Sequence, residues 1–228
     1  MEFVEKVLGE RPYDKQVEML RAVANRRRVS VVGCNASGKD WVAARIVLWW
    51  LHSRAPAKAI VTGPTLRQVD EIVWHEIRTA YSGAEGKLDG RMFRTSRCEQ
   101  TFALAFATNS PCNLQGFHSP YLMVVVTEAH AVRKDDIDAI RRLNPTRLLS
   151  TCNPFVSAGA FFDSHHSRRE LYRTVPIGSL TPASQGCSWS GSCSAWSAYW
   201  AGSTRPFSSW PARLSGYWSV PIPTRRPP

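Results

Sequence analysis

The chain contains 228 residues and carries a formal net charge of +11. A chain of this length can bury the core of one domain, and its positive charge favours a polyanionic partner such as nucleic acid, although charge alone leaves an unspecific basic surface open. No apolar run reaches the roughly 18 residues of a membrane span, so no membrane partner is expected. The six cysteines form no C-x-x-C pair, which argues against zinc and redox motifs and favours reduced thiols.

Residues 3–24 predict two helical pieces, because Gly9 and Pro12 interrupt the stretch. Tyr13 and Gln16 lie just ahead of the first strand. An aromatic ring and an amide in this position can stack on an adenine and hydrogen-bond it. A core position for Tyr13 and a solvated Gln16 are equally compatible with the sequence.

A short β-branched apolar run at residues 29–32 predicts a buried strand that ends at Gly33. The following pattern, Gly33-x-x-x-x-Gly38-Lys39, has the spacing of a phosphate-binding loop. In such a loop the backbone N–H groups point at phosphates and the lysine supplies a point charge. The expected nucleotide-binding residues of this loop are Gly33, Cys34, Asn35, Ala36, Ser37, Gly38, Lys39 and Asp40.

Residues 41–51 are mostly apolar and contain no Gly or Pro, so they predict a helix that starts near Ser37. The N-terminus of that helix would add a partial positive charge beside the phosphates. The residue after Lys39 departs from the usual pattern. Asp40 stands where a Ser or Thr hydroxyl normally holds Mg²⁺.

The middle of the chain alternates strand and helix patterns. Residues 59–63 predict a second buried strand, and residues 66–81 a helix with one apolar face. Residues 82–90 are expected to form a loop, residues 91–107 a hairpin, and residues 109–119 another loop.

The most apolar strand of the chain, residues 121–126, runs directly into Thr127 and Glu128. A carboxylate at such a strand end, opposite a phosphate-binding loop, can orient and activate an attacking water. The usual pair is Asp then Glu, with the Asp holding Mg²⁺. Here Thr127 occupies the first position and only Glu128 is acidic. The plain alternative is a buried strand with a polar cap.

A short helix is predicted at residues 135–143 and a further strand at residues 147–151. That strand delivers Thr151 and Asn153 to a turn closed by Pro154. Polar groups at this strand end could sense a γ-phosphate and couple hydrolysis to movement. An ordinary Asn-Pro turn explains the same residues.

His165 and His166 have no other plausible ligand nearby and are expected on the surface, and residues 172–177 predict a last strand. The alternation of elements up to residue 180 predicts an α/β fold with three layers, a mostly parallel sheet covered by helices on both faces. Ligands of such folds bind at the carboxyl ends of the strands. Together with the loop at residues 33–40, this pattern predicts that residues 1–180 form one P-loop NTPase domain.

Residues 181–228 differ from the rest of the chain in composition and in the spacing of their apolar residues. They contain no Asp, Glu or Lys, and five tryptophans are scattered among Ser, Gly, Pro and Arg without a helical or strand period. We interpret this tail as an out-of-frame translation product of a GC-rich gene. The alternative is an aromatic and arginine-containing segment that stacks on nucleic-acid bases.

Four segments, taken in order, resemble the ATPase domain of the large terminase subunit of tailed phages. They are VVGCNASGKDWVAARIVLWWL, VTGPTLRQVDEIVWHEIR, GFHSPYLMVVVTEAHAV and NPTRLLSTCNPF, and the resemblance covers residues 10–178. In that family the domain hydrolyses ATP to drive DNA through a portal into an empty capsid, and an RNase H-like nuclease domain follows. Nothing after residue 180 resembles a nuclease. The resemblance thus implies a truncated terminase, such as one from a decaying prophage, without nuclease activity.

The resemblance also implies roles for individual residues: Lys39 with its loop as phosphate cradle, Glu128 as catalytic carboxylate, Thr151 and Asn153 in a coupling motif, and Gln16 as adenine contact. It implies ATP and Mg²⁺ as ligands. The implied partners are double-stranded DNA, the portal protein, the small terminase subunit and further copies of the chain. The implied location is the bacterial host cytoplasm, transiently at the procapsid portal.

Asp40 and Thr127 both depart from the family pattern, and we hypothesise that they represent one exchange. If both flank the same Mg²⁺, a hydroxyl and a carboxylate have traded places. An equally simple interpretation is that Thr127 is a lesion in an inactive copy. The candidates for an arginine finger are Arg67, Arg133, Arg141 and Arg142.

Two other functions stay open from the sequence. One is a different nucleic-acid-dependent P-loop ATPase, such as a helicase-like translocase. The other is a non-enzymatic remnant that binds nucleotide or DNA without turnover.

Overall fold

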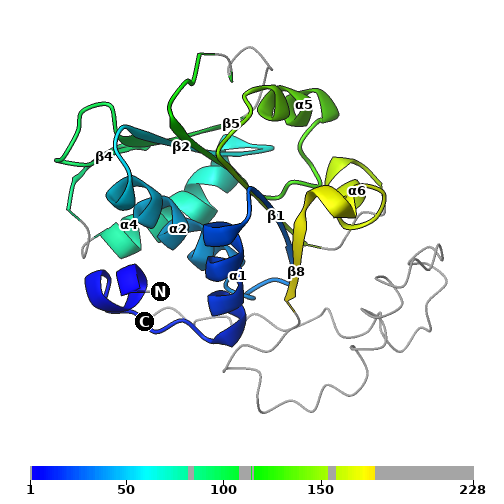
Figure 1. Ribbon diagram of the computed structural model, residues 1–228, viewed down its shortest axis with the longest axis horizontal. Coiled ribbons are helices and arrows are strands. Elements are labelled where there is room, and N and C mark those ends of the chain that lie inside the picture. Colours follow the sequence, from blue (N-terminus) through cyan, green and yellow to red (C-terminus); the bar gives the residue numbers. More distant parts are fainter. Residues whose placement is uncertain (1, 82–84, 108–113, 115, 154–157, 178–228) are drawn as a thin grey trace, which may run out of the picture. The chain divides into compact units, whose positions relative to one another are not determined.

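The computed structural model describes residues 2–81, 85–107, 114, 116–153 and 158–177 (Figure 1). The chain divides into two compact units, Met1–Cys187 and Ser188–Pro228, and every described residue lies in the first. The tail that the sequence sets apart, residues 181–228, lies outside the described residues, so both of its interpretations stay predictions. None of the described helices is long and apolar enough to cross a bilayer.

Within the described residues, eight strands form one sheet in the order β3-β4-β5-β2-β6-β7-β1-β8. Neighbours from β5 to β8 in this order are parallel, whereas the β3–β4 and β4–β5 pairs are antiparallel. The strands are β1 (Arg28–Gly33), β2 (Ala57–Gly63), β3 (Lys87–Asp89), β4 (Met92–Arg94), β5 (Phe102–Ala107), β6 (Tyr121–Val126), β7 (Arg147–Cys152) and β8 (Arg173–Ile177).

Helices cover both faces of this sheet (Figure 1). One hydrophobic cluster joins α1, α2 and α4 to one face, and a second joins α5 and α6 to the other. The central strands are apolar along most of their length because both of their faces are covered. The helical segments are η1 (Phe3–Val7), α1 (Asp14–Asn25), α2 (Lys39–Ser53), α3 (Leu66–Gln68), η2 (Val69–Trp74), α4 (His75–Tyr81), α5 (Lys134–Arg142), α6 (Ala160–His165) and η4 (Arg169–Leu171).

The predicted α/β fold with a mostly parallel sheet is confirmed, including the hairpin formed by β4 and β5. The helix expected at residues 66–81 is present, but its middle part, η2, is a π-helix. The loop expected at residues 82–90 contains a strand, β3. This strand was missed because it is a short edge strand whose Lys87 and Asp89 are exposed, so its sequence has no apolar run. Most of the loop expected at residues 109–119 lies outside the described residues.

His165 is not a surface residue, so that prediction is wrong. It lies in α6, only 5% exposed, and its Nε2 is 2.9 Å from the Ser30 hydroxyl, which is also 2.7 Å from the Ser164 hydroxyl. Burial lowers the pKa of His165 to about 3, so the ring is neutral at neutral pH. No local pattern indicates this burial, because α6 is short and its contact with β1 joins residues far apart in the chain.

A buried arginine ties helices α2 and α4 to the segment before α1 on the α2 face of the sheet. Arg45 of α2 has a side chain that is 2% exposed, and its Nη2 lies 2.5 Å from Glu10 Oε1 and its Nη1 2.6 Å from Glu76 Oε2. The guanidinium also stacks 4.3 Å from the ring centre of Trp41. A buried charge that loses its partners is strongly destabilising, so this ion triad fixes the segment before α1 and helix α4 on α2.

We expect Arg45→Ala to lower the free energy of unfolding by about 3 kcal/mol, since it removes a buried guanidinium that holds two carboxylates and the Trp41 ring and leaves a cavity in its place. The matched control is Arg78→Ala, which removes an ion pair with Asp70 whose side chains are 40% and 38% exposed. That exposed pair is expected to contribute less than about 1 kcal/mol. Urea denaturation of both variants measures the difference, and equal losses would contradict a stabilising role for the buried triad.

Candidate functional site

The candidate site lies at one edge of the sheet, where four parallel strands end. Strand register places Val32 beside Cys152, Ser150 beside Val126, and Val126 beside Thr62. The segments that follow these strands therefore meet at the same edge, which is where ligands of parallel sheets bind. They are the loop after β1 and the residues that follow β2, β6 and β7.

The loop between β1 and α2 is held in a tight conformation. Gly38 has a φ of +74° and Ala36 a φ of +58°, so the chain turns twice through the left-handed region. The N-cap of α2 is Gly38, so the helix begins two residues later than the sequence suggested. This arrangement brings the loop backbone and the first turn of α2 together at the strand edge, as anion binding requires.

Tyr13 and Gln16 contact this loop directly. The Tyr13 hydroxyl donates a hydrogen bond of 2.5 Å to the Ser37 carbonyl, and a Cβ placed on Gly38 would lie 2.5 Å from Gln16 Nε2. Gln16 is only 8% exposed, so a solvated Gln16 is ruled out. The two side chains brace the loop from α1, a structural role that sequence reasoning did not foresee.

Lys39 and Asp40 begin helix α2 on the inner side of the loop. Lys39 is 3% exposed, and its Nζ lies 3.6 Å from Asp40 Oδ2. The Thr127 hydroxyl, at the end of β6, donates to Asp40 Oδ1 over 3.5 Å. Burial raises the pKa of Asp40, while the Lys39 ammonium and the Thr127 hydroxyl oppose that rise. The two residues that depart from the family pattern are thus in contact.

Glu128 is held in a sharp turn after β6. Its φ is +47°, and the turn is fixed on both sides by the Thr127 amide, which donates to the Thr62 carbonyl at 2.9 Å, and the Ala129 amide, which donates to the Thr151 carbonyl at 3.0 Å. Burial raises the pKa of the Glu128 carboxyl; the Lys39 ammonium lowers it and the Asp40 carboxylate raises it. A non-glycine residue in this strained conformation, with a carboxylate made more basic, is typical of a functional position.

The end of β7 touches the loop through a side-chain hydrogen bond. Asn153 Nδ2 donates to Asn35 Oδ1 at 2.8 Å. Asn153 Oδ1 and the Thr151 hydroxyl are buried and have no hydrogen-bond partner among the described residues. Buried polar atoms of this kind cost free energy unless a ligand or water satisfies them.

The four arginine candidates separate into two groups. Arg67 follows β2 and Arg133 follows β6, so both lie toward the edge that carries Lys39. Arg141 and Arg142 lie in the last turn of α5, which leads into the amino end of β7 at the opposite edge.

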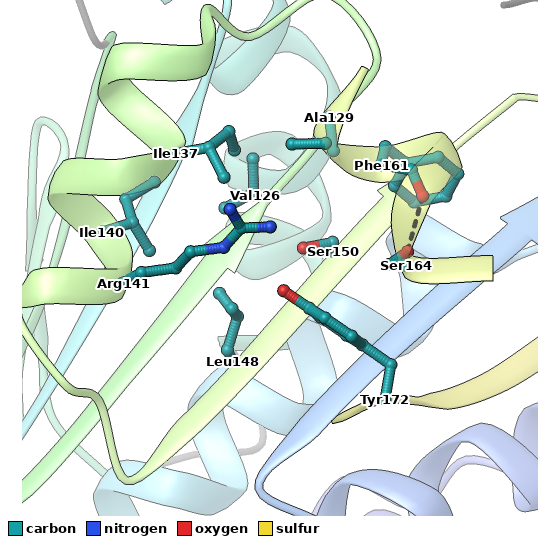
Figure 2. Close-up of a pocket in the computed structure, with 11 residues that line it drawn as sticks. Val126, Ala129, Ile137, Ile140, Arg141, Leu148, Ser150, Phe161, Ser164 and Tyr172 are labelled. Atoms are coloured by element: carbon teal, nitrogen blue, oxygen red, sulfur yellow. Dashed lines mark hydrogen bonds between the residues drawn. The ribbon is translucent and has the colours of Figure 1, made fainter. Parts of the chain in front are cut away.

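Figure 2 shows that Arg141 points into a hollow between α5, β6, β7 and α6, toward Tyr172. This hollow is lined mainly by apolar side chains and encloses only about 10 Å³, room for about one water molecule. None of the loop residues lines it. It is therefore not a nucleotide site, and Arg141 is in no position to reach the phosphate loop.

Sequence reasoning missed two side chains of this edge, His130 and Cys152. The Cys152 thiol lies 3.0 Å from His130 Nδ1, which lies 3.5 Å from Glu128 Oε2. Burial raises the pKa of Cys152 to about 12. His130 follows Glu128 by two residues, and this spacing was the available sign of a cluster. The cluster could not be predicted from it, because His130 and Cys152 meet only when β6 and β7 are neighbours.

Comparison with solved structures identifies the fold. The ATPase domain of the large terminase of Thermus phage P74-26 matches with a TM-score of 0.54 and 15% identity, over 72% of this chain and 73% of that one. A large terminase from another thermophilic bacteriophage, in complex with ADP, matches with a TM-score of 0.62 and 14% identity, over 78% of this chain and 48% of that one.

The fold is that of a phage large-terminase ATPase domain. A further structure of the second terminase contains ATP-gamma-S and matches with a TM-score of 0.61. No protein-family model and no curated protein matches the chain. The terminase fold is therefore established by structure alone, and the chemistry depends on the residues described above.

The tight loop of this terminase fold gives a stability test. Alanine at Gly38 would adopt a left-handed conformation and also clash with Gln16, whereas alanine at Gly90, with a φ of +54°, has nothing within 4 Å of its Cβ. We expect Gly90→Ala to cost about 1 kcal/mol of unfolding free energy and Gly38→Ala to cost more, since the Gln16 amide, whose oxygen accepts from the Tyr13 backbone N–H, has to shift. Chemical denaturation of the two variants measures this, and similar losses would show that α1 does not brace the loop.

Proposed function

We propose that this chain is the ATP-hydrolysing motor domain of a terminase-type DNA-packaging machine. The observation that carries the proposal is the contact between the start of α2 and the end of β6, where Thr127 donates to Asp40. It places Lys39 and Glu128 at one edge, within electrostatic reach of each other. A single triphosphate held between them would have its phosphates on the lysine and its reacting end beside the glutamate.

The loop is proposed to bind the phosphates. Its backbone N–H groups and the N-terminus of α2 provide partial positive charge, and Lys39 adds a full one. Because Lys39 is buried, its interaction with phosphate would be screened less than that of a surface lysine. Tyr13 and Gln16 contribute by fixing the loop, and Gln16 also, as the family resemblance implies, by contacting the adenine.

Glu128 is proposed to take the proton from the attacking water. Its carboxylate has to be ionised before the reaction and basic enough to accept a proton. Burial raises its pKa and so makes the carboxylate more basic, while the Lys39 ammonium favours the ionised form. The hydrogen bonds on both sides of the turn hold Glu128 in place, so little reorganisation would be needed when water attacks.

Asp40 and Thr127 fit a magnesium ion, because they offer a carboxylate and a hydroxyl, hard oxygen ligands, side by side at the phosphate loop. When bound, Mg²⁺ would neutralise phosphate charge. We propose that the hydroxyl and the carboxylate have exchanged places relative to the usual pattern. A bound cation would also favour the ionised form of Asp40 and so offset the burial that raises its pKa.

The hydrogen bond from Asn153 to Asn35 offers a route from nucleotide state to movement. A change in the loop on hydrolysis would break or shift this bond at the end of β7. We propose that Thr151 and Asn153 couple hydrolysis to translocation of double-stranded DNA, which the net charge of +11 favours as a partner.

In this proposal residues 1–180 form the ATPase domain. A portal protein, a small terminase subunit and further copies of the chain are its partners, in the cytoplasm of a bacterial host. Arg67 and Arg133 are the arginines whose position suits a finger. Arg67 already pairs with Glu71 of the next helical turn at 3.0 Å, so it would have to leave this exposed ion pair.

Two substitutions test the proposed roles. Lys39→Ala is expected to weaken ATP binding at least tenfold, and Glu128→Gln to retain ATP binding within about threefold while lowering the hydrolysis rate at least 100-fold. The matched controls are Lys87→Ala and Glu99→Gln, which change exposed residues away from the loop. Binding of a fluorescent ATP analogue and phosphate release in Mg²⁺ measure the two effects.

Wild-type rates in Glu128→Gln would refute the proposed base. ATP binding without turnover in the wild-type chain would instead favour a nucleotide-binding remnant, for which the Thr127 departure is the supporting observation.

The exchange of ligand types is tested by Asp40→Thr and Thr127→Asp, singly and together. Asp40→Thr leaves two hydroxyls and Thr127→Asp places two carboxylates together, so each is expected to lower Mg²⁺-dependent hydrolysis at least tenfold. The double variant restores one of each and is expected to recover most of the rate. Titration of Mg²⁺ in each variant measures this, and the idea fails when the double variant is no better than the worse single one.

A further inference from the structure

Three side chains with metal-binding atoms converge where β6 and β7 end. Cys152 Sγ lies 3.0 Å from His130 Nδ1, and His130 Nδ1 lies 3.5 Å from Glu128 Oε2. All three ligand atoms lie within 4.8 Å of one another. They belong to two neighbouring strand ends whose backbones are fixed by parallel pairing and by the Ala129–Thr151 hydrogen bond.

These separations suit a tetrahedral ion. Zinc bonds of about 2.3 Å to sulfur and about 2.0 Å to nitrogen or oxygen require ligand atoms roughly 3.3–3.6 Å apart. The Cys152–His130 and His130–Glu128 distances lie within that range or a few tenths of an ångström from it. The Glu128 and Cys152 ligand atoms lie within 4.8 Å of each other, so side-chain rotations would have to bring that pair closer to admit an ion.

The chemistry of the ligands selects a class of metal. A thiol and an imidazole beside one carboxylate favour Zn²⁺ and similar ions over Mg²⁺, which prefers oxygen ligands only. The Asp40–Thr127 pair offers only oxygen ligands and therefore favours Mg²⁺. Two cation positions of different preference would thus share one edge of the sheet.

The three side chains are also placed for entry of an ion. Cys152 is buried, but the side chains of Glu128 and His130 are 11% and 22% exposed, so one side of the cluster opens to solvent. Three protein ligands leave a fourth position for water. The nearby Lys39 ammonium, which disfavours a cation, has the Asp40 carboxylate 3.6 Å away to balance it.

We propose that Glu128, His130 and Cys152 form a binding site for a thiophilic divalent cation of the Zn²⁺ type. Binding replaces the thiol proton, which passes to solvent, with a metal–sulfur bond, and engages the Glu128 carboxylate as a ligand. A consequence that rests on the proposed function is that the bound ion withdraws Glu128 from the attacking water and stops ATP hydrolysis. Zn²⁺ would then inhibit under conditions in which Mg²⁺ supports the reaction.

Co²⁺ added to the full chain without nucleotide tests the site directly, because a cobalt–thiolate bond gives a charge-transfer absorption band. The wild type and Cys98→Ser, the matched control at a partly buried cysteine, are expected to show this band. Cys152→Ser is expected to lose it, and one equivalent of Zn²⁺ is expected to displace it from the wild type. His130→Gln, a second variant on the more exposed ligand, is expected to weaken Co²⁺ binding at least tenfold, with circular dichroism to show that both variants fold.

A band that persists in Cys152→Ser, or its absence from the wild type, would overturn the site. Since this measurement uses no ATP, it can succeed in a chain that does not hydrolyse ATP. Inhibition is then measured as the Zn²⁺ concentration that halves each protein's own Mg²⁺-dependent rate. That concentration is expected to rise at least tenfold in His130→Gln and to stay within about twofold in Cys98→Ser. Equal sensitivity of His130→Gln and wild type would overturn the inhibitory role.

Discussion

The contact between Asp40 and Thr127 is the interaction on which this site depends. Strand β7 lies between β1 and β6, so no backbone pairing joins the loop between β1 and α2 to the strand that carries Glu128. Side chains have to make that connection across β7, and the Thr127 hydroxyl does so at 3.5 Å from Asp40. A second connection runs from Asn153, at the end of β7, to Asn35 in the loop. Strand β7 therefore lies between the loop and the strand that carries Glu128, and it contacts the loop through Asn153.

Charge and burial set what this edge can bind. Lys39 is one positive group among two carboxylates, Asp40 and Glu128, and burial raises the pKa of both carboxyls. A triphosphate placed there would add more negative charge in a poorly solvated place, where like charges repel strongly. Binding of nucleotide and binding of a divalent cation would consequently be coupled. The same shortage of positive charge explains why Glu128, His130 and Cys152 suit a second type of cation.

The sequence predicted the central strands, the tight loop between β1 and α2, and the positions of Glu128 and Asn153 at strand ends, because buried parallel strands are continuous apolar runs whose ends can be read from the sequence. It did not predict β3, whose exposed Lys87 and Asp89 lack such a run. It placed His165 wrongly because the contact with Ser30 spans 135 residues. It also missed the meeting of His130 and Cys152, since that depends on which strands are neighbours, a tertiary property that no local pattern contains. The braces from Tyr13 and Gln16 were missed for the same reason.

The central claim is that the loop before Lys39 and the carboxylate of Glu128 face one nucleotide. A crystal structure of the chain with Mg²⁺ and a slowly hydrolysed ATP analogue tests this most directly. We expect the terminal phosphate between Lys39 Nζ and the Glu128 carboxylate, with the metal beside Asp40 and Thr127. A nucleotide bound elsewhere, or one whose terminal phosphate lies out of reach of Glu128, would contradict it.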